Sequence, residues 1–118
     1  MATDLSVAID AIFEKNRAEI DRRITTLEKT VAALLARDLD DALRTSAEHD
    51  AHKLAGSLGM FGFPTGSKLA REVAEVLRAG SGPAVSDAPR LAGLVGELRD
   101  EFCARATSRI PDDPSTQR

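Results

Sequence analysis

The sequence predicts an all-α fold, an antiparallel up-and-down four-helix bundle with a long N-terminal helix. Three observations lead to this prediction. Apolar residues recur at steps of three and four along most of the chain, and no segment shows the alternation of a strand. The first glycine is Gly56 and the first proline is Pro64, so residues 1–55 contain no helix breaker. The composition is dominated by Ala, Leu, Glu, Asp and Arg, as in many helical proteins.

The first predicted helix covers about residues 4–37, with Thr3 as a candidate N-cap. A single helix of this length would measure about 48 Å, at about 1.5 Å per residue. Because the later helices are too short to cover it, we expect its first half to overhang them, to bend, or to break near residues 16–21. The apolar pattern leaves these alternatives open.

Three further helices are predicted in the rest of the chain. The second covers about residues 40–62 with Asp38 or Asp40 as its cap, and the third covers about residues 64–79. A flexible connection of turn-forming residues, 80–85, separates the third helix from the fourth.

The fourth helix is expected to begin after Ser86, its predicted N-cap. We expect Cys103 to be a small core residue on the apolar stripe of this helix. The polar segment 111–118 is predicted to be a disordered tail, which leaves residues 1–110 as one domain.

Composition and charge exclude several classes of protein. The net charge of −3 argues against a general nucleic-acid binder, which needs a basic face. No apolar run approaches the roughly 20 residues that span a bilayer, and the N-terminus lacks a signal-peptide pattern. Cys103 is the single cysteine, so we expect neither a disulfide framework nor a thiolate metal cluster. These features are typical of a soluble, cytoplasmic protein.

The second helix places a histidine on its outer side. At about 100° per residue, its apolar residues fall on one stripe, and His52 points about 145° away from the middle of that stripe. The residues that form the stripe are Leu43, Ala47, Ala51, Leu54, Leu58 and Phe61. We predict that the exposed side of the helix around His52 docks a partner protein. The residues assigned to this docking surface are Glu48, His49, Ala55, Gly56 and Gly59.

The two glycines are the strongest reason for this interpretation. Each exposed glycine in a helix costs about 1 kcal/mol relative to alanine, so a helix selected only for stability would not carry them. Gly56 and Gly59 leave bare backbone within about 40° of the direction of His52, where another protein can approach closely. An exposed imidazole is also largely neutral near pH 7, and its ring nitrogen can form a covalent phosphoramidate. This chemistry implies no cofactor for this chain, because a partner can supply the metal ion.

The segment AHKLAGSLGMFGFPTGSKLAREVAEVLRAG, residues 51–80, resembles the histidine phosphotransfer (HPt) domains of bacterial multistep phosphorelays. The residues that match the family pattern are His52, Leu54, Gly56, Ser57, Gly59 and Gly62. The resemblance implies a four-helix bundle that accepts a phosphoryl group on His52 and transfers it to or from a receiver aspartate. It implies response-regulator receiver domains and an upstream histidine kinase as partners, acting directly or through the kinase's own receiver. Neither nucleic acid nor membrane is expected as a partner.

One position departs from the family pattern. The family usually has a lysine three residues after the histidine, whereas this chain has Ala55. Candidates to support the phosphoryl group instead are Lys53, next to the histidine, and Lys68 and Arg71 on the third helix.

Other interpretations are less well supported by the sequence. His49 is best explained as a solvated neighbour, and a His49–His52 metal site lacks a third ligand. We expect Phe61 and Phe63 in the core. The basic residues of the first helix are expected on its solvent-exposed (wet) face; these are Arg17, Arg22, Arg23 and Lys29.

Two alternative functions are considered. One is a scaffolding bundle without phosphotransfer, and the other is a dimerisation and phosphotransfer fragment of a sensor kinase, whose ATP-binding domain has no room in 118 residues. Partner identity, direction of transfer and oligomeric state stay open.

Overall fold

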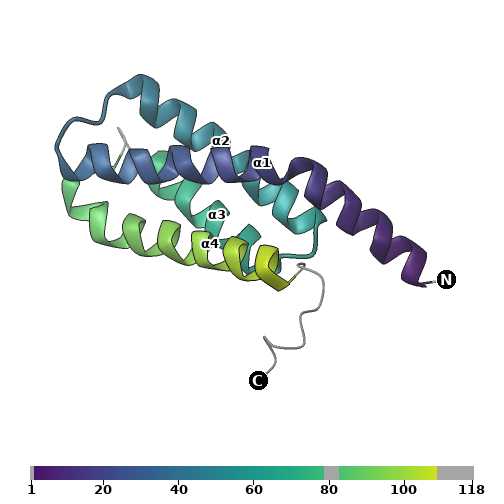
Figure 1. Ribbon diagram of the computed structural model, residues 1–118. Coiled ribbons are helices and arrows are strands. Elements are labelled where there is room, and N and C mark those ends of the chain that lie inside the picture. The colour runs from purple at the N-terminus through teal and green to yellow at the C-terminus, as the bar shows by residue number, and fades with distance from the viewer. Residues whose placement is uncertain (1, 79–82, 109–118) are drawn as a thin grey trace.

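The computed structural model is a bundle of helices that run alternately in opposite directions (Figure 1). It describes the backbone of residues 2–78 and 83–108 and the side chains of residues 11–78 and 83–104. The elements are α1 (Ala2–Leu35), α2 (Asp41–Met60), α3 (Pro64–Arg78), a short 3-10 helix η1 (Val85–Asp87) and α4 (Ala88–Ser108). Both α1 and α3 pack against α2 and α4, so the predicted four-helix bundle is confirmed. The predicted tail and residues 80–82 of the predicted connection lie outside the described residues.

The long first helix is continuous. α1 has no interruption between Ala2 and Leu35, so the predicted alternative of a break near residues 16–21 is wrong. Its N-terminal end extends beyond the other three helices, as the overhang alternative predicted (Figure 1). Within the described part of the chain, no helix combines the length and apolar character needed to cross a membrane.

Local signals set the boundaries of α2. Of the two predicted caps, Asp40 is the one used, because its side chain accepts a hydrogen bond of 2.7 Å from the Leu43 backbone N–H. At the other end, Gly62 has φ of 83°, and the Phe63 N–H donates to the Leu58 carbonyl at 2.8 Å. This is a Schellman motif, which ends a helix at a residue of positive φ.

Two other helix ends differ from the expected pattern. α1 ends with the same motif, but the residue of positive φ is Arg37, at 59°, where glycine would be unstrained. The predicted cap Ser86 is wrong, because η1 precedes α4 and the Asp87 side chain accepts a hydrogen bond of 2.8 Å from the Ala84 N–H.

The core is filled by leucines, alanines and all four phenylalanines of the chain. Phe13 of α1 lies at the centre of an aromatic cluster, with ring centroids 5.8, 5.4 and 6.1 Å from those of Phe61, Phe63 and Phe102 respectively. These rings come from α1, from the α2–α3 turn and from α4. The predicted core positions of Phe61 and Phe63 are confirmed, since their exposed fractions are 3% and 4%.

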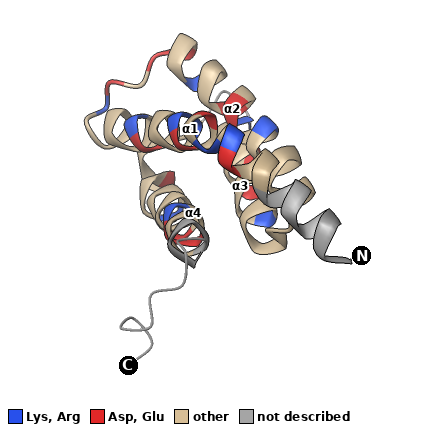
Figure 2. Ribbon diagram, turned by 45° about the vertical axis from the view of Figure 1, so that its right-hand side comes forward, with Lys and Arg blue, Asp and Glu red and all other residues tan. Residues whose placement is uncertain are grey.

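Charged side chains join α1 to its two neighbours. Figure 2 shows acidic and basic residues intermixed along α1. Arg99 of α4 donates to Glu28 and Asp21 of α1, and the hydrogen bonds to Glu28 contribute most to raising the pKa of this guanidinium. On the other side, Arg23 pairs with the buried carboxylate of Asp50 in α2 at 2.6 Å. The prediction that Arg23 lies on the wet face is therefore wrong.

One further prediction about the core is wrong. Cys103 is exposed, whereas its neighbour Phe102 is buried. The buried stripe of α4 runs through Leu91, Leu94, Val95, Leu98 and Phe102, and at about 100° per residue Cys103 points beyond the edge of that stripe.

Candidate functional site

His52 lies midway along α2 and faces outwards. The exposed fraction of its side chain is 50%. The neighbouring residues Ala51, Leu54 and Leu58 are fully buried and anchor the opposite side of the helix in the core. The prediction from helical periodicity that His52 points to solvent is confirmed.

Polar contacts on both sides of α2 hold its backbone in place. Asp50 pairs with Arg23 of α1, as described above. On the α3 side, the Ser67 hydroxyl donates to the Ala55 carbonyl at 2.7 Å. Nearer the start of α2, the Arg44 guanidinium donates to the Leu77 carbonyl at 3.2 Å and so satisfies an end carbonyl of α3. His52 is thus carried by a helix tied to both of its neighbours, which orients the imidazole.

Two oppositely charged groups lie close to the same ring nitrogen of His52. Nη1 of Arg78, the last residue of α3, lies 3.4 Å from Nε2 of His52. Oε2 of Glu48, one turn earlier on α2, lies 3.8 Å from Nε2. The other Glu48 oxygen lies 3.7 Å from Arg44 Nη1. The ring nitrogen therefore lies between a guanidinium and a partly neutralised carboxylate.

The basic residues expected beside the phosphoryl group do not contact His52. Lys68 and Arg71 are exposed on α3, and no hydrogen bond or ion pair of the described side chains joins either of them to the ring. Lys53 faces the α1 side, where it lines a hollow of about 450 Å³ between α1 and α2. The residues around this hollow are Asn16, Glu19, Ile20, Arg23, Lys53, Gly56, Ser57 and Met60.

The residues predicted to dock a partner occupy different environments. His49 and Gly56 are exposed, and Glu48 is half-buried with 21% of its side chain exposed. The outward position predicted for Ala55 is wrong, because α3 covers it and only 8% of the residue is exposed.

The two glycines of the site differ from each other. A Cβ added to Gly56 would meet no atom within 4 Å, whereas a Cβ on Gly59 would lie 3.4 Å from the Ser67 hydroxyl of α3. Gly59 therefore has a packing neighbour inside the domain. Gly56 has none, and its open surroundings agree with the interpretation of a surface left free for a partner.

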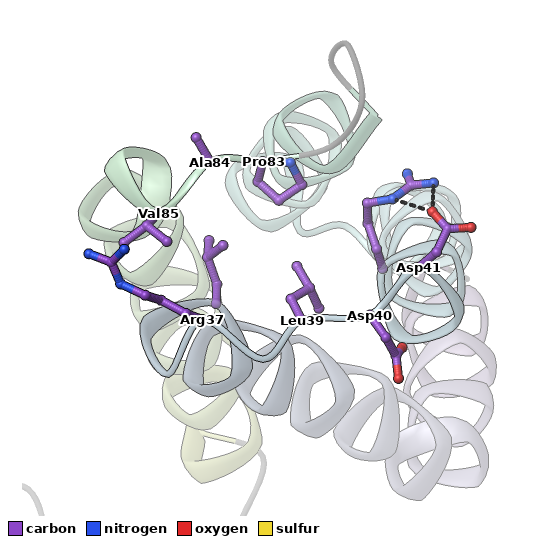
Figure 3. A pocket seen from close by; sticks show the side chains of 9 residues that line it. Arg37, Leu39, Asp40, Asp41, Pro83, Ala84 and Val85 are labelled. Atoms are coloured by element: carbon purple, nitrogen blue, oxygen red, sulfur yellow. Dashed lines mark hydrogen bonds and ion pairs between the residues drawn. The ribbon is translucent and has the colours of Figure 1, made fainter.

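A second hollow, of about 520 Å³, lies at the end of the bundle where α1 connects to α2 (Figure 3). Its lining residues are Leu34, Arg37, Leu39, Asp40, Asp41, Arg44, Pro83, Ala84 and Val85. His52 does not line it, and the Arg44 and Asp41 side chains drawn there pair with each other at 2.7 Å. Within the described residues, no cluster of His, Cys, Asp and Glu is arranged to hold a metal ion.

Comparison with protein families identifies the chain. The model of the Hpt domain matches residues 11–102, most of the sequence and all of the described bundle except its ends. The chain belongs to the Hpt domain family. Hpt domains are helical phosphocarriers of phosphorelays, which carry the phosphoryl group on a histidine and are not enzymes in the usual sense. Comparisons with curated proteins and with solved structures found no match.

Reasoning from the sequence did not identify Arg78 as a neighbour of the histidine. In this Hpt domain, Arg78 lies 26 residues after His52 and reaches it only because α3 runs back along α2. The antiparallel arrangement pointed to α3 as a source of positive charge. It did not show which of three basic side chains on that helix extends to the ring.

Proposed function

We propose that this Hpt domain is a phosphocarrier whose phosphoacceptor is His52. The observation that carries the proposal is the half-exposed imidazole on a helix anchored on both sides, next to the open backbone of Gly56. A nucleophile of this kind needs access for a phosphorylated partner and a fixed orientation, and little else from its own chain.

The partners in this proposal are response-regulator receiver domains and an upstream histidine kinase, acting directly or through its own receiver. Nε2 of His52 attacks the phosphorus of a receiver acyl phosphate, the bond from phosphorus to the aspartate oxygen breaks, and the aspartate leaves as a carboxylate. The Nδ1 proton stays on the ring, which gains one positive charge as the N–P bond forms. Reversal of this step on another receiver delivers the phosphoryl group.

The nucleophile is tested with phosphoramidate as a small phosphoryl donor and intact mass as the readout. We expect one acid-labile, alkali-stable phosphoryl adduct on the wild-type protein and on His49→Gln, and none on His52→Gln. Circular dichroism of both variants checks that the bundle is folded. If the wild type gained no adduct from phosphoramidate or from phosphorylated receivers, the scaffolding alternative would replace the carrier.

A further inference from the structure

Arg78 is the basic residue that contacts the reacting nitrogen of His52. A guanidinium is a donor at every physiological pH and has no acceptor, so its contact with Nε2 fits the ring tautomer with a lone pair on Nε2 and the proton on Nδ1. The separation of 3.4 Å is longer than that of a strong hydrogen bond, and the side chain of Arg78 is exposed. Nε2 is therefore contacted by a cation without being enclosed by it.

Arg78 is also free to follow a group added to the ring. It forms no ion pair with any carboxylate among the described side chains, and its contact with His52 is the only hydrogen bond that its side chain makes there. By contrast, Arg44 is engaged by Asp41, Glu48 and the Leu77 carbonyl. The residue three positions after His52 is Ala55, which brings no charge to this side of the helix.

From this geometry, we propose that Arg78 is a catalytic residue whose guanidinium neutralises the phosphoryl group as it bonds to Nε2 of His52. The inference rests on the proposed function, because it requires His52 to be the phosphoacceptor. When Nε2 bonds to phosphorus, the phosphoryl oxygens take up the space beside the ring nitrogen that Arg78 already borders. A guanidinium binds such oxygens through paired N–H groups, and charge-assisted hydrogen bonds of this kind are the strong ones.

Glu48 opposes this effect at the same nitrogen. Its carboxylate lies 3.8 Å from Nε2 and repels a phosphoryl group that forms there. Arg44, 3.7 Å from the other carboxylate oxygen, reduces this repulsion. Removing the charge of Glu48 and removing that of Arg78 should therefore change the rate of phosphorylation in opposite directions.

The test compares Arg78→Ala, Arg78→Lys and Glu48→Gln with the wild type. Phosphoramidate is the donor, so no receiver contributes charge, and the readouts are the rate of adduct formation and the half-life of the adduct. We expect Arg78→Ala to form the adduct about tenfold more slowly and to lose it faster, as for the loss of one charge-assisted contact. Arg78→Lys should restore part of the rate, and Glu48→Gln should raise it.

Lys68→Ala and Arg71→Ala are the matched controls, because each removes one exposed positive charge from the same helix without a contact to His52. Both should keep the wild-type rate. Equal rates and half-lives for Arg78→Ala and the wild type would overturn the inference but leave the carrier function intact. Absence of any adduct on the wild type would instead refute the proposed function. Should Arg78→Ala fail to fold, Arg78→Gln gives the same comparison with the guanidinium charge removed.

Discussion

At the scale of single residues, the open space beside His52 is a feature of the site, as are the side chains around the ring. Gly56 follows the histidine by one helical turn, and nothing lies within 4 Å of the position that a Cβ would occupy. A glycine there weakens the helix and gains no packing in return. The cost is understandable if a partner backbone must approach the imidazole closely.

Gly56→Ala should separate stability from transfer. We expect it to raise the free energy of unfolding by about 1 kcal/mol, because alanine is the better helix former. It should slow phosphoryl transfer from a phosphorylated receiver by about tenfold, equivalent to roughly 1.4 kcal/mol of docking energy. Its phosphorylation by phosphoramidate should be unchanged. Urea unfolding measures the stability, and quenched time courses of phosphoryl transfer measure the rate.

Gly93→Ala is the control for this prediction. Gly93 lies on α4, is exposed, and also has open space where a Cβ would be. The same gain in stability without any change in transfer is expected there. Transfer at the wild-type rate in Gly56→Ala would show that the open backbone is not needed for docking.

At the scale of helices, the pair Arg23–Asp50 determines how α1 lies against α2. Asp50 is 5% exposed, and Arg23 is its closest cationic partner at 2.6 Å. Arg22 approaches the same carboxylate only to 3.9 Å, and 55% of its side chain is exposed. A buried carboxylate that loses its cation keeps the full cost of desolvation.

Arg23→Ala should therefore destabilise the domain by about 2 kcal/mol, because it leaves Asp50 without its near partner. Arg22→Ala removes an exposed guanidinium of the same helix and should leave the free energy of unfolding close to that of the wild type. Urea unfolding of the two variants side by side measures the difference. Equal effects would mean that the pair contributes no more than an ordinary surface ion pair.

At the scale of the whole molecule, the aromatic cluster closes the end of the bundle where α2 turns into α3. Phe13 contributes to it from α1, with its ring 5.8 Å from that of Phe61 and 5.4 Å from that of Phe63. The cluster thus joins segments from the start, middle and end of the chain. We expect its integrity to decide whether the four helices unfold as one cooperative unit.

Phe13→Ala should lower the free energy of unfolding by about 4 kcal/mol, since it opens a cavity among buried rings. Ile12→Ala is a neighbouring control: Ile12 is 46% exposed, so its truncation should cost less than about 1 kcal/mol. Thermal and urea unfolding, followed by circular dichroism, would measure both. A small loss in Phe13→Ala would indicate that the domain tolerates rearrangement at this end.

The four helices and the outward direction of His52 could be predicted from the sequence, because helical periodicity is a local property of each segment. Local signals also limited the cap of α2 to Asp38 or Asp40, and the structure uses Asp40. The Hpt motif adds to this, since it assigns a role to a histidine that periodicity alone only exposes.

The contacts of the site were decided by the tertiary structure. Ala55 is buried because α3 covers that side of α2, and Arg23 leaves the wet face because Asp50 lies opposite it. Arg78 reaches from α3 to His52 on the neighbouring helix α2, whereas Lys68 and Arg71 of α3 make no contact with the ring. These outcomes depend on the rotation of each helix about its axis and on the reach of long side chains. The residues of one helix do not determine either quantity. Both are fixed only when the helices pack against one another.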